Sequence, residues 1–271
     1  MCGIVGFVGR EEAAPILLDG LERMEYRGYD SAGVAVRSET AGLQVRKTKG
    51  RLQVLSDLIH GGADLEGNLG IGHTRWATHG EPSDVNSHPQ VSESGRFAVV
   101  HNGIIENYME LREFLQSEGI TFVSQTDTEV VAQLLEHYYD GDILDAVVKT
   151  LNRIQGAYAW ALSAPTAPTG SSPPGRTALI IGYGQNGNFI ASDVTAVIKY
   201  TRDVVLHGRW GDRCTAIGKA LIIGACVRKP HKMTNAPRYD VVVSFEIAVL
   251  TAGSAQHLPD GGSNTRFFRN H

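Results

Sequence analysis

The order of the expected secondary-structure elements predicts an α+β fold with antiparallel sheets. Apolar segments of strand length come first, three consecutive helical patterns follow, and strand patterns return at 158–162 and 178–191. Helices and strands therefore do not alternate strictly, as they do around a doubly wound parallel sheet. With 271 residues, 42% of them hydrophobic and 20% charged, the chain is long enough for one large globular domain or two small ones.

Each element is predicted from its apolar spacing and from the residues at its ends. Residues 3–8 have the composition of a buried strand bounded by glycines, and Cys2 lies at its mouth. Residues 74–90 are expected to form a long loop, of the kind that is commonly functional in compact domains. Further strands are expected at 34–36, 43–45, 69–73, 97–101, 158–162, 178–181 and 188–191, and helices at 11–24, 51–60, 106–118, 128–139 and 142–154.

Charge, cysteine content and hydropathy exclude several classes of protein. The formal net charge is −4, which gives no overall electrostatic case for binding nucleic acid. The three cysteines show no C-x-x-C spacing, which argues against a disulfide framework or a zinc site. The apolar runs are too short to cross a bilayer, and no secretory leader opens the chain. We therefore expect a cytoplasmic protein without a membrane or nucleic-acid partner.

The most informative single residue is Cys2, which directly follows Met1. Cysteine is small, so we expect Met1 to be removed during maturation. Cys2 would then combine a thiol of ordinary pKa about 8.5 with a free α-amine of pKa about 7.7–8.0. Such an amine is partly unprotonated at neutral pH and can take up the thiol proton, as in a nucleophile that carries its own base. The alternative is a cysteine that only packs.

Asn102 and Gly103 are candidates for stabilising a negatively charged oxygen. If Cys2 attacks an acyl carbon, the tetrahedral intermediate requires fixed hydrogen-bond donors. Asn102 offers a side-chain amide and Gly103 a backbone N–H, at the end of the strand expected at 97–101. Glycine also allows the backbone to approach a substrate closely. The alternative is an ordinary Asn-Gly turn, which spacing alone favours.

Two charged residues are candidates for holding a substrate. Arg75 has the side chain that pairs with a carboxylate through two parallel hydrogen bonds. Asp127 stands at the start of an expected helix, where its default role is that of an N-cap, and where it could alternatively bind an ammonium group. Arg75 and Asp127 together would bracket an α-amino acid.

The histidines do not predict a metal site. His73 and His79 are six positions apart on a strand-to-loop segment, with no obvious third ligand. His88 and His101 have no ligand spacing either, and we expect them to be structural.

Five segments in order resemble one family closely. They are Met-Cys-Gly-Ile-Val-Gly at 1–6, Tyr-Arg-Gly-Tyr-Asp-Ser-Ala-Gly at 26–33, Gly-His-Thr-Arg-Trp-Ala-Thr-His-Gly at 72–80, His-Asn-Gly-Ile-Ile-Glu-Asn-Tyr at 101–108 and Thr-Asp-Thr-Glu at 126–129. Together they resemble the glutaminase domain of the glutamine–fructose-6-phosphate aminotransferases, which are class II glutamine amidotransferases among the N-terminal nucleophile hydrolases. The resemblance covers about residues 2–205 and is highly specific.

The resemblance implies a four-layer αββα sandwich of antiparallel sheets and an enzyme that hydrolyses L-glutamine. Cys2 would be the nucleophile, with its α-amine as base, and would form a γ-glutamyl thioester with release of ammonia. Asn102 and Gly103 would form the oxyanion hole. The resemblance implies no cofactor and no metal for this half-reaction.

The resemblance also implies how glutamine is bound. Arg75 would hold the α-carboxylate of glutamine and Asp127 its α-ammonium group. The loop that closes over glutamine would contain Trp76, Thr78 and His79. A turn beside the nucleophile would contain Arg27 and Gly28.

The last quarter of the chain departs from the family pattern. Residues 206–271 hold nine Lys/Arg and four Asp/Glu, a balance of 9 − 4 = +5. We expect a basic insertion at 206–244, a returning strand at 245–253 and a mobile tail at 254–271. The two sugar-isomerase lobes that follow the glutaminase in this family are not expected in a chain of this length. The resemblance allows for a separate sugar-phosphate isomerase domain or subunit as a partner. An altered, catalytically silent module that binds glutamine is the alternative.

Overall fold

The computed structural model describes residues 2–76, 80–165, 179–205, 221–227 and 246–251. Two of the predicted substrate-loop residues, Thr78 and His79, lie outside these ranges. So do the predicted tail at 254–271 and most of the predicted insertion. No helix among the described residues is both long and apolar enough to cross a bilayer.

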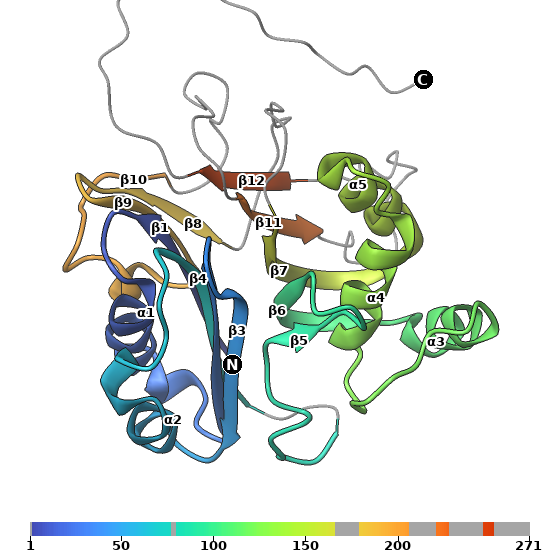
Figure 1. Ribbon diagram of the computed structural model, residues 1–271, viewed down its shortest axis with the longest axis horizontal. Helices are drawn as coiled ribbons and strands as arrows, with labels where there is room; N and C mark the ends of the chain where they lie inside the picture. The colour runs from blue at the N-terminus through green and yellow to red at the C-terminus, as the bar shows by residue number, and fades with distance from the viewer. Residues whose placement is uncertain (1, 77–79, 166–178, 206–220, 228–245, 252–271) are drawn as a thin grey trace, which may run out of the picture.

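Two antiparallel sheets form the middle of the molecule (Figure 1). In spatial order, the strands of the first sheet are β10 (Val204–Val205), β8 (Ile180–Tyr183), β9 (Gly187–Ala191), β1 (Gly3–Gly9), β4 (Leu69–Arg75), β2 (Ser31–Ser38) and β3 (Gly42–Lys49). The strands of the second sheet are β12 (Glu246–Thr251), β11 (Leu221–Val227), β7 (Gly156–Ala164), β6 (Ala98–Ile105) and β5 (Gln90–Val91). The hairpin expected at 178–191 is confirmed, because β8 pairs with β9.

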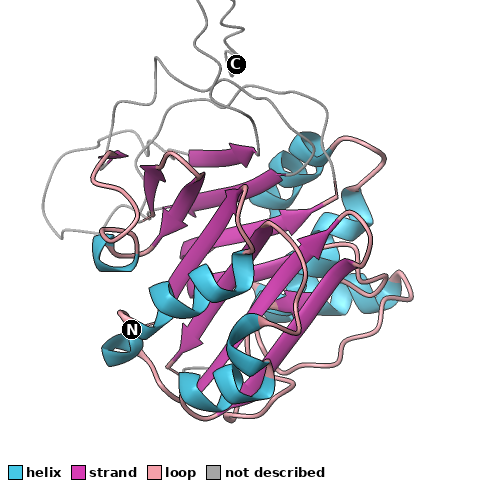
Figure 2. Ribbon diagram, turned by 60° about the vertical axis from the view of Figure 1, so that its left-hand side comes forward, coloured by secondary structure: helices cyan, strands magenta, loops and turns pink. Residues whose placement is uncertain are grey.

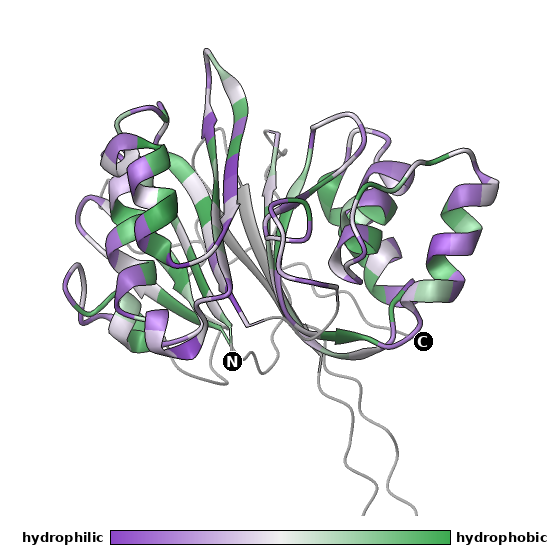
Figure 3. Ribbon diagram, turned by 90° about the horizontal axis from the view of Figure 1, so that it is seen from below, coloured by the Kyte–Doolittle hydropathy of each residue, from purple (hydrophilic) through white to green (hydrophobic). Residues whose placement is uncertain are grey.

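Helices cover the outer face of each sheet (Figures 1 and 2). The first sheet is covered by α1 (Ala13–Glu22) and α2 (Leu52–Leu58), which share a core cluster with it. The second is covered by α3 (Tyr108–Ser117), α4 (Thr128–Tyr138) and α5 (Ile143–Arg153). Figure 3 shows the two helical layers on opposite sides of the molecule, with the sheets between them. The predicted four-layer αββα sandwich is confirmed.

An apolar layer between the two sheets follows from two-residue alternation along the strands. The inward side chains of β1 and β4 include Ile4 and Ile71, and those of β6 and β7 include Val100 and Ala161. All four are fully buried. Burying a side chain of the size of Ile or Val contributes about 1.5–3 kcal/mol to stability. This layer therefore holds the sheets together and fixes their separation.

Glycines in β4 let α1 lie directly on the first sheet. A Cβ atom at Gly70 would lie 2.8 Å from the Leu17 side chain, and one at Gly72 would lie 2.9 Å from Leu21. Real Cβ atoms essentially never approach other heavy atoms this closely. In β4, glycines thus face α1 and allow it to pack closely, whereas the larger residues that alternate with them face the layer between the sheets.

The strand β6 differs from its predicted extent. The sequence predicts a strand that ends at 101, whereas β6 continues to Ile105. Asn102 and Gly103 therefore lie inside a strand, opposite Ala159 and Tyr158 of β7. The Asn-Gly turn that local spacing favours is wrong, because pairing with β7 keeps the backbone extended.

Strands also occur in the last quarter of the chain. Within the range predicted to be an insertion, β11 pairs with β7 from Leu221 to Val227. The strand β12 lies within 245–253, where the returning strand was expected, and pairs with β11. The second sheet thus extends past residue 206.

Candidate active site

One end of the layer between the sheets is polar. On β4 the inward row passes from Ile71 to His73 and Arg75. On β6 the row that contains Val100 includes Asn102, and Cys2 directly precedes β1 in line with Ile4. Polar side chains on or next to β1, β4 and β6 therefore lie together at this end of the layer.

Cys2 lies half-buried at this end, against the backbone of Trp76. Its Sγ accepts a hydrogen bond from the Trp76 N–H at 3.2 Å and lies 3.5 Å from the Trp76 carbonyl oxygen. Burial raises the pKa of the Cys2 thiol, while the Trp76 N–H and the positive charge of Arg75 act in the opposite direction. Because burial is the largest of these effects, a base beside the thiol would favour formation of the reactive thiolate near neutral pH.

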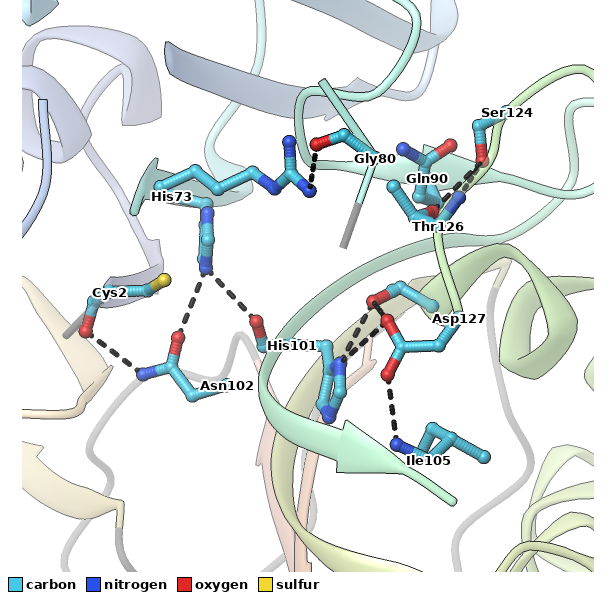
Figure 4. A network of polar contacts seen from close by, with 12 residues as sticks. Cys2, His73, Gly80, Gln90, His101, Asn102, Ile105, Ser124, Thr126 and Asp127 are labelled. Atoms are coloured by element: carbon cyan, nitrogen blue, oxygen red, sulfur yellow. Dashed lines mark hydrogen bonds and ion pairs between the residues drawn. The ribbon is translucent and has the colours of Figure 1, made fainter. Parts of the chain in front are cut away.

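Asn102 connects Cys2 with the buried histidine of β4 (Figure 4). The Asn102 Nδ2 donates a hydrogen bond to the Cys2 carbonyl oxygen at 3.1 Å. On its other side, the Asn102 Oδ1 lies 3.0 Å from the His73 Nε2. The amide group of Asn102 is thus held at both ends next to the candidate nucleophile.

Gly103 has a backbone conformation that requires glycine. Its φ is +120°, in the region that L side chains rarely adopt. A Cβ atom there would lie 2.3 Å from the Ala157 carbonyl oxygen. Any other residue at this position would strain β6 directly beside Asn102.

Arg75 is buried although it carries a charge. Its side chain is 4% exposed, and its Nη2 lies 3.4 Å from the Gly80 carbonyl oxygen. Burial lowers the pKa of the guanidinium group, and the charges of Cys2 and Asp127 raise it. Arg75 therefore lies within electrostatic reach of both of these residues.

Asp127 precedes α4, but its carboxylate does not cap this helix. The Asp127 Oδ2 accepts a hydrogen bond from the Ile105 N–H at 2.8 Å, and Oδ1 lies 4.0 Å from the His101 Nδ1 (Figure 4). The default N-cap role is thus wrong for this side chain. Its carboxylate points toward the end of β6, beside the candidate oxyanion hole.

The turn that contains Arg27 and Gly28 supports the site from outside. The Arg27 Nη1 pairs with the Asp193 carboxylate at 2.8 Å, which fastens the turn to the residues after β9. A Cβ atom at Gly28 would lie 2.9 Å from the backbone carbon of Arg75. Glycine therefore lets the turn approach the Arg75–Trp76 peptide, whose N–H contacts Cys2.

Among the predicted site residues that the structure describes, hydrogen bonds join Cys2 with Trp76 and with Asn102, whereas Arg27 pairs with Asp193. His88 and His101 are buried, in agreement with structural roles. Among the described residues, no group of three or more His, Cys, Asp or Glu side chains is arranged to hold a metal ion.

Sequence reasoning assigned no role to His73, which the structure places against Asn102. A signal was available. Leu69, Ile71, His73 and Arg75 occupy alternate positions, so the apolar row predicts that His73 faces the same side as Arg75.

Part of this chain matches a known family model. Residues 73–199 match the family model described as a glutamine amidotransferase domain. Residues 73–199 therefore resemble a glutamine amidotransferase domain. Asn102 lies within the matched range, and Cys2 precedes it.

Curated relatives resemble the amidotransferase domain over most of this chain. A glutamine–fructose-6-phosphate aminotransferase (isomerizing) from Caldanaerobacter subterraneus subsp. tengcongensis is 56% identical over 205 residues, which cover 75% of this chain and 33% of the relative. One from Thermus thermophilus is 51% identical over 208 residues, covering 76% and 34% respectively. The chain thus spans about a third of the length of the curated relatives it matches.

Solved structures share the fold of the amidotransferase domain. The glutamine phosphoribosylpyrophosphate amidotransferase from B. subtilis, complexed with ADP and GMP, matches with a TM-score of 0.63 at 24% identity, over 83% of this chain and 47% of that one. A structure described as the allosteric regulatory enzyme of purine biosynthesis matches with the same TM-score at 26% identity and the same coverage. This likeness concerns the fold.

Proposed function

We propose that the domain hydrolyses L-glutamine to glutamate and ammonia through a γ-glutamyl thioester on Cys2. The observation that carries this proposal is the meeting of Cys2, Asn102 and Arg75 at one end of the inter-sheet layer. The free α-amine of Cys2, after removal of Met1, takes the thiol proton. The Cys2 Sγ then attacks the side-chain amide carbon of glutamine.

The tetrahedral intermediate places a negative charge on the former carbonyl oxygen. The Asn102 amide and the Gly103 N–H stabilise this oxygen as the oxyanion hole. The α-amine next gives its proton to the leaving nitrogen, the C–N bond breaks and ammonia departs. Water then attacks the thioester, the C–S bond breaks, and glutamate is released with return of the proton to Cys2.

Two opposite charges select glutamine as an α-amino acid. Arg75 binds the α-carboxylate, and Asp127 binds the α-ammonium group. Asp127 is near enough for its charge to raise the pKa of Arg75, so one ligand can reach both side chains. Trp76, which is 46% exposed, would form part of the loop that closes over glutamine, together with Thr78 and His79. The turn of Arg27 and Gly28 packs against the Arg75–Trp76 peptide, whose N–H contacts the Cys2 Sγ.

We also propose that the ammonia serves glucosamine-6-phosphate synthesis. The curated relatives are named for this use of glutamine with fructose-6-phosphate, and this chain matches only about a third of their length. A sugar-phosphate isomerase domain or subunit would then supply the second half-reaction. A reducing cytoplasm suits the free thiol of Cys2.

The direct test measures glutamate and ammonia release from glutamine by the purified chain. Mass spectrometry first establishes whether Met1 has been removed, and quenched samples are searched for a glutamyl adduct on Cys2. We expect hydrolysis without a requirement for fructose-6-phosphate. A folded chain with a free Cys2 amine, bound glutamine and no turnover would instead identify a silent glutamine-binding module.

A variant that retains a residue before Cys2 provides the matched control. Its Cys2 nitrogen belongs to a peptide bond and cannot accept a proton, whereas the rest of the site is unchanged. We expect the loss of nearly all turnover. Full activity in this variant would show that the α-amine is not the base.

A further inference from the structure

The buried residue His73 is held in one defined chemical state. Its Nε2 lies 3.0 Å from the His101 carbonyl oxygen and 3.0 Å from the Asn102 Oδ1. A peptide carbonyl oxygen only accepts hydrogen bonds, so the Nε2 must carry the hydrogen. Burial lowers the pKa of His73 to about 3, so the ring is neutral at physiological pH and holds its single N–H at Nε2.

This N–H fixes which way the Asn102 amide points. The Nε2–H is shared between the His101 carbonyl oxygen and the Asn102 side chain, and an amide N–H at that place would oppose a second donor, so the oxygen of the amide faces His73. The amide nitrogen then faces Cys2, where it donates to the Cys2 carbonyl oxygen. Without the donor, rotation of the amide by half a turn would direct its oxygen toward the developing negative charge, where it would repel that charge.

We propose that His73 is a positioning residue, which orients the Asn102 amide so that its N–H groups face the reacting oxygen. The proposal rests on the proposed function. His73 does not touch the reacting atoms itself, because it acts through Asn102. The oxyanion hole on the second sheet would thus depend on one further residue, which lies on the first sheet.

The surroundings of His73 fit positioning. The His73 Nδ1 is buried without a hydrogen-bond partner among the described residues, as expected if only the Nε2 contact is required. The ring of His88 packs against that of His73, with 4.5 Å between the ring centroids. His88 has no described contact with Asn102 and provides a matched control within the same buried cluster.

Kinetics of three variants separate positioning from packing. We expect His73→Leu to lower kcat by about 10²-fold, near the ~10²–10³ for direct loss of an oxyanion donor, with the KM for glutamine nearly unchanged. His73→Gln places an amide N–H near the position of Nε2 and should restore most of kcat. His88→Leu should leave kcat per folded molecule near that of the wild type. Equal losses in the Leu and Gln variants of His73, or in His88→Leu, would overturn the proposal.

A double-mutant cycle tests whether His73 acts through Asn102. Combining His73→Leu with Asn102→Ala should be no worse than Asn102→Ala alone, because the group to be oriented is gone. Multiplicative losses would show that His73 contributes by another route.

Nitrogen-15 NMR tests the inference without turnover, and it separates this proposal from the proposed function. The His73 ring should carry its hydrogen on Nε2 at neutral pH. The Asn102 side-chain amide should give one set of signals in the wild type and in His73→Gln, and two sets or exchange broadening in His73→Leu. A hydrogen on Nδ1 would refute the positioning role even in an active enzyme. A wild type that is inactive would refute the proposed function even with these signals present.

Discussion

The two ends of the inter-sheet layer are formed by the same strands, but one end is apolar and the other is polar. At one end, Ile4, Ile71 and Val100 are fully buried and apolar. At the other end, the same rows contain Cys2, directly before β1, and Asn102 of β6, which are only partly buried. Inward-facing positions of the same strands thus carry apolar residues that form a core at one end and polar residues that form the candidate site at the other.

This difference separates stability from chemistry. The apolar end holds the two sheets at a fixed distance, so the polar end has a defined geometry before a ligand binds. Changes at the apolar end should lower stability and leave kcat per folded molecule intact. Changes at the polar end should lower kcat and leave stability near neutral pH largely intact.

The largest expected effect is that of Cys2→Ala at the polar end. Removing the nucleophile should lower glutamate release on the order of 10⁴-fold or more. The melting temperature should hardly change, because Cys2 lies at the edge of the core. Turnover is measured by ammonia release, and the adduct by mass spectrometry. Detection of a glutamyl adduct in this variant would place the nucleophile elsewhere.

Asn102→Ala should have the next largest effect. Loss of one oxyanion donor lowers kcat by ~10²–10³. Because Asn102 is proposed to contact the transition state rather than the ends of glutamine, the KM should change little. Steady-state kinetics with glutamine give both values. Retention of wild-type kcat would remove Asn102 from the oxyanion hole.

Arg75→Lys should chiefly weaken glutamine binding. Lysine keeps the charge but cannot form two parallel hydrogen bonds with a carboxylate. We expect the KM for glutamine to rise roughly 10–100-fold, which corresponds to the loss of a charged hydrogen bond of about 1.5–3 kcal/mol. An analogue that lacks the α-carboxylate should not discriminate between the two proteins. Discrimination with that analogue would contradict the role of Arg75.

The histidines beside the site should make stability fall in acid. Burial lowers the pKa of His73 to about 3 and that of His88 well below its ordinary value of 6.5. Below about pH 6.5, these histidines are therefore protonated in the unfolded chain but remain neutral in the folded chain. Each histidine lowers stability by up to about 1.4 kcal/mol per pH unit as the pH falls. Urea unfolding between pH 7 and pH 5 should show a smaller slope in His73→Gln, and an unchanged slope would contradict this prediction.

The smallest effect is expected at the apolar end. Ile71→Val removes one methylene group from the fully buried inter-sheet layer. It should cost about 0.5–1.5 kcal/mol of the free energy of unfolding, with kcat per folded molecule unchanged. Urea unfolding and kinetics on the same preparation provide the check. A fall in kcat beyond twofold would show that the two ends are coupled.

Local patterns predicted most elements, and they failed where distant pairing decides the backbone. The first strand, the hairpin of β8 with β9 and the helix pattern before β7 follow from neighbouring residues alone. Asn102-Gly103 has the composition of a turn, yet it forms part of a strand because β7 pairs with it. Asp127 has the composition of a cap, yet its carboxylate bonds to the Ile105 N–H.

The sequence by itself determined the inward rows, the glycine positions and the segments that resemble the family, because these depend on residues a few positions apart. Only the tertiary structure decided that Asn102 reaches Cys2, 100 positions away, and that His73 lies against it from the opposite sheet. Strand order and register between sheets arise from contacts between distant segments, which no local pattern contains. The candidate site lies where those contacts bring residues of β1, β4 and β6 together.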